Sequence, residues 1–158
     1  MINSKFWVLS LMMIMLVIVS CGEKKSSATP TMGANAVPSK EEYDPNRGKG
    51  KFNESNLVIE GFDSALAGRG DGISNTKCAS CHKMTDERLV GPGWAGVTQR
   101  RTAFWLMNFI TDPDPMIDRD PELQAQLELC LVRMPNQNLS DDDARAVYEY
   151  MRKIDGAN

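Results

Sequence analysis

The nine residues 76–84, TKCASCHKM, constrain the fold of this chain more than any other stretch. Cys78 and Cys81 stand three residues apart, and His82, the single histidine of the sequence, follows directly. Three kinds of site use two thiols and an imidazole this close together: a structural zinc site, a redox-active dithiol and a covalently attached haem. Each of them needs a different surrounding fold, so the rest of the sequence decides between them.

Residues 1–20 have the pattern of an export signal. Lys5 precedes a run from Phe6 to Val19 that is apolar except for Ser10, and a small residue closes the segment. The run is shorter than the 18 or more apolar residues expected of a membrane-spanning helix. We therefore expect residues 1–20 to be a signal peptide, with the rest of the chain outside the cytoplasm.

Cys21 ends the sequence IVSC, which resembles a bacterial lipobox. In that motif the cysteine is lipidated and becomes the first residue of the mature protein, and two or more acyl chains hold a protein on a membrane durably. This predicts a membrane-anchored lipoprotein in the bacterial cell envelope, facing the periplasm. The alternative is an uncleaved signal anchor in which Cys21 is an incidental thiol.

Composition divides the remaining chain into a linker and a domain. Residues 21–56 are rich in Ser, Lys, Pro, Gly and Asn without helical or strand periodicity, so we expect them to form a flexible tether behind Cys21. Residues 57–158 suit one compact domain. Removing the signal peptide takes away one cation and no acid, which moves the formal charge from −3 to −4 and argues against a nucleic-acid partner.

The domain is expected to be all-α. Ser140 and Asp143 have capping-box spacing ahead of an amphipathic segment that ends near Gly156. Helical patterns also cover residues 101–112 and 121–132, and a fourth helix must approach the cysteines from around residue 63 or 66. In the helix over 121–132 a leucine stripe forms the expected buried face, at Leu123, Leu127 and Leu131.

This helical context favours haem over the other two chemistries. A zinc site needs a fourth ligand besides the motif, and the adjacent Cys81 and His82 rarely reach one small ion. A redox dithiol would want a βαβ surround, which the sequence lacks. Two thiols one helical turn apart can each add to a vinyl group on one porphyrin edge, with His82 projecting over the ring to the iron. We therefore predict one covalently attached haem c, held by Cys78 and Cys81.

With one histidine, a second iron ligand is most simply a methionine. Six methionines follow the signal peptide, and four of them lie in the tether, beside the haem-binding turn or inside amphipathic helices. Met134 lies in a loop that Pro135 keeps from continuing as helix, so it is the preferred ligand. Met116 is the alternative.

These motifs resemble a monohaem class I cytochrome c of the bacterial periplasmic type, over residues 66–154. GDGISNTKCASCH is similar to the family's first helix and attachment site, GPGWAGV to the loop after the histidine, and RMP with LSDDDARAVYEYM to the methionine loop and closing helix. The resemblance implies four or so helices wrapped around the haem. It also implies a set of haem neighbours, with the Pro92 carbonyl accepting from His82 and Arg100 near a propionate: Pro92, Trp94, Arg100, Phe109 and Ile110.

Two features depart from the family pattern. Ser74 stands where the first helix usually carries an aromatic residue, and residues 114–133 form an insertion before Met134. We expect the insertion to cover one haem edge, with Cys130 buried as a small apolar residue.

The predicted function is electron transfer, without enzymatic activity or a small-molecule substrate. A six-coordinate iron leaves no open position, and the sequence has no carboxylate pair, Ser/His arrangement or phosphate loop elsewhere. The expected partners are redox proteins, besides the membrane that holds the anchor. Two alternatives remain: a haem sensor with a labile Met134, and a non-catalytic haem subunit of a larger reductase or oxidase.

Overall fold

The computed structural model describes residues 42–158. The predicted signal peptide, the predicted lipidation site Cys21 and the predicted tether up to residue 41 lie outside the described residues. Within 42–158 all regular secondary structure is helical, and no helix there is long and apolar enough to cross a membrane. The prediction of an all-α fold is therefore confirmed. The helices are α2 (Ser64–Lys77), α3 (Val97–Arg100), α4 (Ala103–Thr111), α5 (Asp114–Ile117), α6 (Pro121–Cys130) and α7 (Asp141–Ile154).

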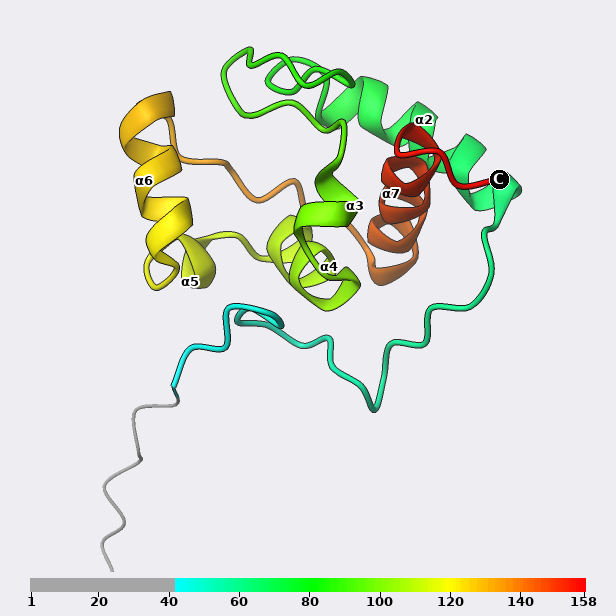
Figure 1. Cartoon of the computed structure of the whole chain (residues 1–158), viewed down its shortest axis with the longest axis horizontal. Coiled ribbons are helices and arrows are strands. Elements are labelled where there is room, and N and C mark those ends of the chain that lie inside the picture. The colour runs from blue at the N-terminus through cyan, green and yellow to red at the C-terminus, as the bar shows by residue number, and fades with distance from the viewer. Residues whose placement is uncertain (1–41) are drawn as a thin grey trace, which may run out of the picture. The chain divides into compact units, whose positions relative to one another are not determined.

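The most extensive contact between helices joins α2 to α7, which lie against each other in Figure 1. Side chains cap both helices, with Asp63 accepting from the first turn of α2 and Ser140 from that of α7. A Cβ atom on Gly70 would lie 2.0 Å from the Ala146 carbonyl oxygen. Glycine at position 70 therefore allows the two helix backbones to touch.

A fully buried carboxylate, Glu149, lies in α7. It pairs with Arg145 at 2.6 Å and with Arg152 at 2.8 Å, so its charge is compensated inside the protein. Arg152 also donates to the Gly61 carbonyl at 3.3 Å. This group of charges fastens the chain ahead of α2 to the closing helix.

Helix α6 contributes a single buried residue, Leu123, to the protein's own packing. The helix ends at Cys130, and Leu131 has a left-handed backbone (φ 57°) with 85% of its surface exposed. The prediction that Leu131 continues the buried stripe is wrong, because the stripe needs a further helical turn that the chain does not form.

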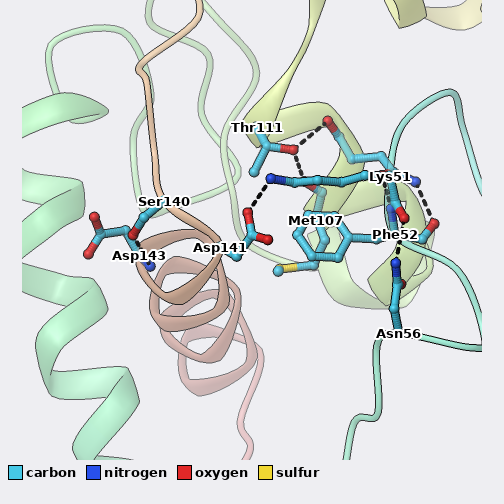
Figure 2. A network of polar contacts seen from close by, with 9 residues as sticks. Lys51, Phe52, Asn56, Met107, Thr111, Ser140, Asp141 and Asp143 are labelled. Atoms are coloured by element: carbon cyan, nitrogen blue, oxygen red, sulfur yellow. Dashed lines mark hydrogen bonds and ion pairs between the residues drawn. The ribbon is translucent and has the colours of Figure 1, made fainter.

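Residues 43–57, the N-terminal strap, are packed on the helices. The Tyr43 hydroxyl donates to Asp120 at 2.6 Å, and Phe52 and Leu57 are buried. Lys51 pairs with Asp141 in the first turn of α7, as Figure 2 shows. The structure here differs from the predicted tether, which extended to residue 56, because residues from Tyr43 onward contact the helices.

Asn108 of α4 accounts for much of this docking. It is fully buried, and its side-chain oxygen accepts from the Phe52 N–H at 2.8 Å. Its amide group donates to the carbonyls of Arg47 and Phe52, both at 3.0 Å. One amide side chain therefore satisfies three backbone groups of a segment that lacks regular structure.

Candidate functional site

The attachment motif follows directly from the end of α2. The Cys78 N–H donates to the Ser74 carbonyl and closes the helix. The N–H groups of Cys81 and His82 then both donate to the Cys78 carbonyl, at 3.0 and 2.9 Å. This tight turn holds the two thiols and the imidazole in one small region.

A single hydrogen bond orients the His82 ring. Nδ1 lies 2.8 Å from the Pro92 carbonyl oxygen, and because a carbonyl only accepts, Nδ1 carries the proton and Nε2 keeps its lone pair. Burial lowers the pKa of His82, with the bond to Pro92 acting in the opposite direction. The neutral ring is the form that binds a metal. A Cβ atom on Gly91 would lie 2.4 Å from His82 Cε1, so glycine is needed for this ring position.

The motif lines a largely apolar cavity of about 590 Å³, which lies within the range of cofactor and ligand pockets. Its walls come from the end of α2, the loop after His82, α4, α6, the loop before α7 and α7 itself. Trp94, whose ring centroid is 5.8 Å from that of His82, lies in this wall. The structure brings every residue predicted for the haem site to this one cavity: Cys78, Cys81, His82, Pro92, Trp94, Arg100, Phe109, Ile110 and Met134.

The two candidate methionine ligands are separated by the structure. Met134 lines the cavity and is half-buried. Met116 is fully buried outside the cavity lining, where a Cβ atom on Gly48 would lie 2.4 Å from its methyl carbon. Met151 also reaches the cavity, from the packed face of α7.

The geometry does not favour the zinc and dithiol chemistries. Among residues 42–158, no three His, Cys, Asp or Glu side chains are grouped as metal ligands. Burial raises the pKa of the Cys78 thiol. Redox-active dithiols instead depend on a lowered thiol pKa.

A second cation of the cavity was missed by the sequence reasoning. Arg101 lines the wall with Arg100, pairs with Glu122 of α6, and has its guanidinium carbon 4.2 Å from the Trp105 ring centroid. An arginine four residues before a tryptophan at the start of a helix was the available signal. Arg100 is exposed, and one of its nitrogens donates to the Ala95 carbonyl at 2.8 Å.

Cys130 also lies in the cavity wall, but it is half-buried rather than buried. Its sulfur accepts from the Arg88 guanidinium at 2.8 Å, and a second nitrogen of Arg88 donates to Gln126 at 2.8 Å. The expectation of a buried apolar cysteine is wrong, because Arg88 reaches across from the loop after His82 and gives the thiol a polar partner.

An all-α domain closed around an apolar cavity, with two thiols and an imidazole in one tight turn, defines a small covalent-cofactor protein. The family model for cytochrome c matches residues 67–155. The chain therefore belongs to the cytochrome c family, in which haem c is covalently bound and electron transfer, typically without enzymatic activity, is the function.

Individual relatives agree with this membership. The solved structure of cytochrome c from Rhodothermus marinus is 34% identical, covers 71% of this chain and 97% of its own, and superposes with a TM-score of 0.63. An engineered form of that cytochrome is 35% identical, with a TM-score of 0.58 over 63% of this chain and 85% of its own. A cytochrome c-553-like protein of Synechocystis sp. is 32% identical over 65 residues, which are 39% of this chain and 62% of the relative.

Proposed function

We propose that this protein is a one-electron carrier between redox proteins, with a single haem c in the cavity described above. When bound, haem c supplies an iron that changes its oxidation state by one electron. The residues present fit such a group, because an apolar wall surrounds two thiols, a neutral imidazole and a thioether. Cys78 and Cys81 would hold the group by thioether bonds, and His82 and Met134 would ligate the metal.

The remaining polar residues of the cavity have supporting roles. The Pro92 carbonyl keeps the His82 ring in one tautomer and orientation. Arg100 and Arg101 provide cations for the cofactor's two carboxylates, with Glu122 and Trp105 holding Arg101 in place. Trp94, Phe109 and Ile110 exclude water, and a dry surround with a sulfur ligand stabilises the reduced metal.

The observation that carries the proposal is that Met134 lines the same cavity as the attachment motif whereas Met116 does not. If His82 and Met134 both ligate the iron, no position would be left for a substrate or a gas.

The test is the visible spectrum of the purified, haem-loaded protein. A sulfur-to-iron band at the red end of the oxidised spectrum, together with slow binding of carbon monoxide by the reduced protein, supports a carrier. Absence of the band with rapid carbon monoxide binding would instead indicate a sensor. Copurification of a stoichiometric protein complex would indicate a permanently docked subunit.

We further propose that the domain is displayed on the periplasmic side of the bacterial envelope by a lipid on Cys21. Support for this comes from the signal-like residues 1–20 and the lipobox-like IVSC. Replacing Cys21 with serine should release the protein from membranes without changing its spectrum. Retention of the variant in membranes would instead indicate an uncleaved signal anchor.

A further inference from the structure

Two buried carboxylates of residues 42–158 have different surroundings. Glu149 is fully buried and pairs with two arginines, so its charge is neutralised where it lies. Asp120 is 2% exposed and forms no ion pair within residues 42–158. Every group that donates a hydrogen bond to it is uncharged. A buried charge without a cation is costly to keep, which indicates that the charge of Asp120 itself has a use.

Four donors surround the Asp120 carboxylate. The Tyr43 hydroxyl and the Trp105 indole N–H both donate to Oδ2, at 2.6 and 3.2 Å. The backbone N–H groups of Glu122 and Leu123 donate to Oδ1, at 2.9 and 3.3 Å, as expected of a helix N-cap. Burial alone would raise the pKa of Asp120, but these hydrogen bonds hold it below its usual value. The carboxylate is therefore ionised at neutral pH.

Capping α6 does not by itself require this charge. Thr102 and Ser140 cap α4 and α7 with neutral hydroxyl groups, and asparagine caps helices as well as aspartate does. The dipole of α6 offsets no more than about half an elementary charge. The remaining negative charge of Asp120 acts on the groups around it.

The indole of Trp105 connects Asp120 to the cavity. It lines the cavity wall, is 4% exposed and stacks on Phe109 with the ring centroids 5.0 Å apart. Arg101, which lies over the same indole, already has an acid partner in Glu122. Because the carboxylate and the indole are both buried, the field of Asp120 reaches the cavity through protein rather than through water.

We propose that the Asp120 carboxylate, held against Trp105, lowers the midpoint potential of the cofactor bound in this cavity. The proposal rests on the proposed function, because it concerns the same one-electron couple. A negative charge stabilises the oxidised iron, which carries one more positive charge than the reduced iron. The N-terminal strap takes part, since Tyr43 donates the shortest of the four hydrogen bonds to Asp120, although no strap residue lines the cavity.

The test is the midpoint potential of the haem-loaded full chain, measured by spectroelectrochemical titration in the parent and in Asp120→Asn. Asparagine keeps a capping oxygen and removes the charge, and Asp120→Ser supplies a second neutral cap should the first variant fold poorly. Glu128→Gln is the matched control, because it removes the same charge from an exposed position of the same helix. Tyr43→Phe is the second comparison, because it removes one hydrogen bond and keeps the charge.

We expect the equilibrium constant for reduction by a reference couple to rise about tenfold in both neutral variants of Asp120, as for a unit charge acting through the protein interior. Glu128→Gln should change it by less than about twofold, because water screens an exposed charge. Tyr43→Phe should change it by less than about threefold. The rise in Asp120→Asn should persist at high ionic strength, and its oxidised spectrum should keep the red-end band.

Three results would overturn the proposal while leaving the carrier function intact. The first is a parental or lower midpoint potential in both neutral variants of Asp120. The second is a rise of equal size in Tyr43→Phe or in Glu128→Gln, which would assign the effect to packing or to general surface charge. The third is loss of the red-end band in both Asp120 variants, which would make the residue purely structural. A parent without a reversible one-electron couple would instead overturn the proposed function.

Discussion

Replacing Asn108 with alanine should detach the N-terminal strap and lower the stability of the haem-loaded protein. The change removes three buried hydrogen bonds, one accepted from the Phe52 N–H at 2.8 Å and two donated to the carbonyls of Arg47 and Phe52 at 3.0 Å. Each such bond contributes roughly 1 kcal/mol net. The expected loss in the free energy of unfolding is therefore about 2–4 kcal/mol, or on the order of 10 °C in the melting temperature of a domain this size.

Denaturant unfolding, followed by far-UV circular dichroism, measures the stability loss, and hydrogen exchange at the Phe52 amide reports the docking of the strap directly. Asn75→Ala is the control, because Asn75 is exposed on α2 and its side-chain amide donates to the nearby Asp71 carboxylate at 2.8 Å. We expect it to change stability by less than about 0.5 kcal/mol. An Asn108→Ala protein that loses under about 1 kcal/mol, or keeps its Phe52 amide protected, would refute this account of the strap.

Four further substitutions test other parts of the structure. Met134→Ala should abolish the red-end band of the oxidised spectrum, whereas Met116→Ala should keep the band and lower the free energy of unfolding by about 2–4 kcal/mol, because a buried side chain leaves a cavity. Gly91→Ala should place a methyl carbon about 2.4 Å from Cε1 of the His82 ring. Because the ring must then move, the midpoint potential in a redox titration should shift. Burial alone would raise the pKa of Asp120, but the hydrogen bonds it accepts from Tyr43 and other donors hold it below the usual 3.8. Its contribution to stability is therefore present above about pH 3.8 and is lost as the pH falls through the lower folded value, so Tyr43→Phe should flatten the acid limb of the unfolding curve.

The sequence predicted α4, α6 and α7 because their signals are local, whereas α2 was expected because a helix must lead to the attachment cysteines. Capping side chains, apolar spacing and the stop at Pro113 all act within one or two turns, and the structure has helices at the expected places. The residues of the cavity were also predictable, because the resemblance to the cytochrome c family implies which segments surround the motif around Cys78. The short helices α3 and α5 were missed, because four residues carry too little periodicity.

What the sequence could not predict depends on contacts between distant residues. The strap resembles a disordered linker in composition, and its docking depends on distant partners such as the buried amide of Asn108 and the carboxylate of Asp120. The tertiary fold brings Arg88 and Arg101 to partners in α6 that are distant in the sequence. Arg88 bonds to Cys130, 42 residues away, and Arg101 pairs with Glu122, 21 residues away. The sequence also did not predict that α6 ends at Cys130, because the leucine spacing alone favours a helix that continues through Leu131.

The strap also has a consequence for the lifetime of the folded state. Its contacts close long loops, with 77 residues between Tyr43 and Asp120, 90 between Lys51 and Asp141 and 56 between Phe52 and Asn108. Loops of this length are costly to close early, so the strap should dock after the rate-limiting step of folding. Interactions absent from that transition state slow unfolding and leave the folding rate unchanged. A strap that contributes about 3 kcal/mol to stability then slows unfolding by roughly 100-fold. This short irregular segment would therefore contribute to the kinetic stability of the domain.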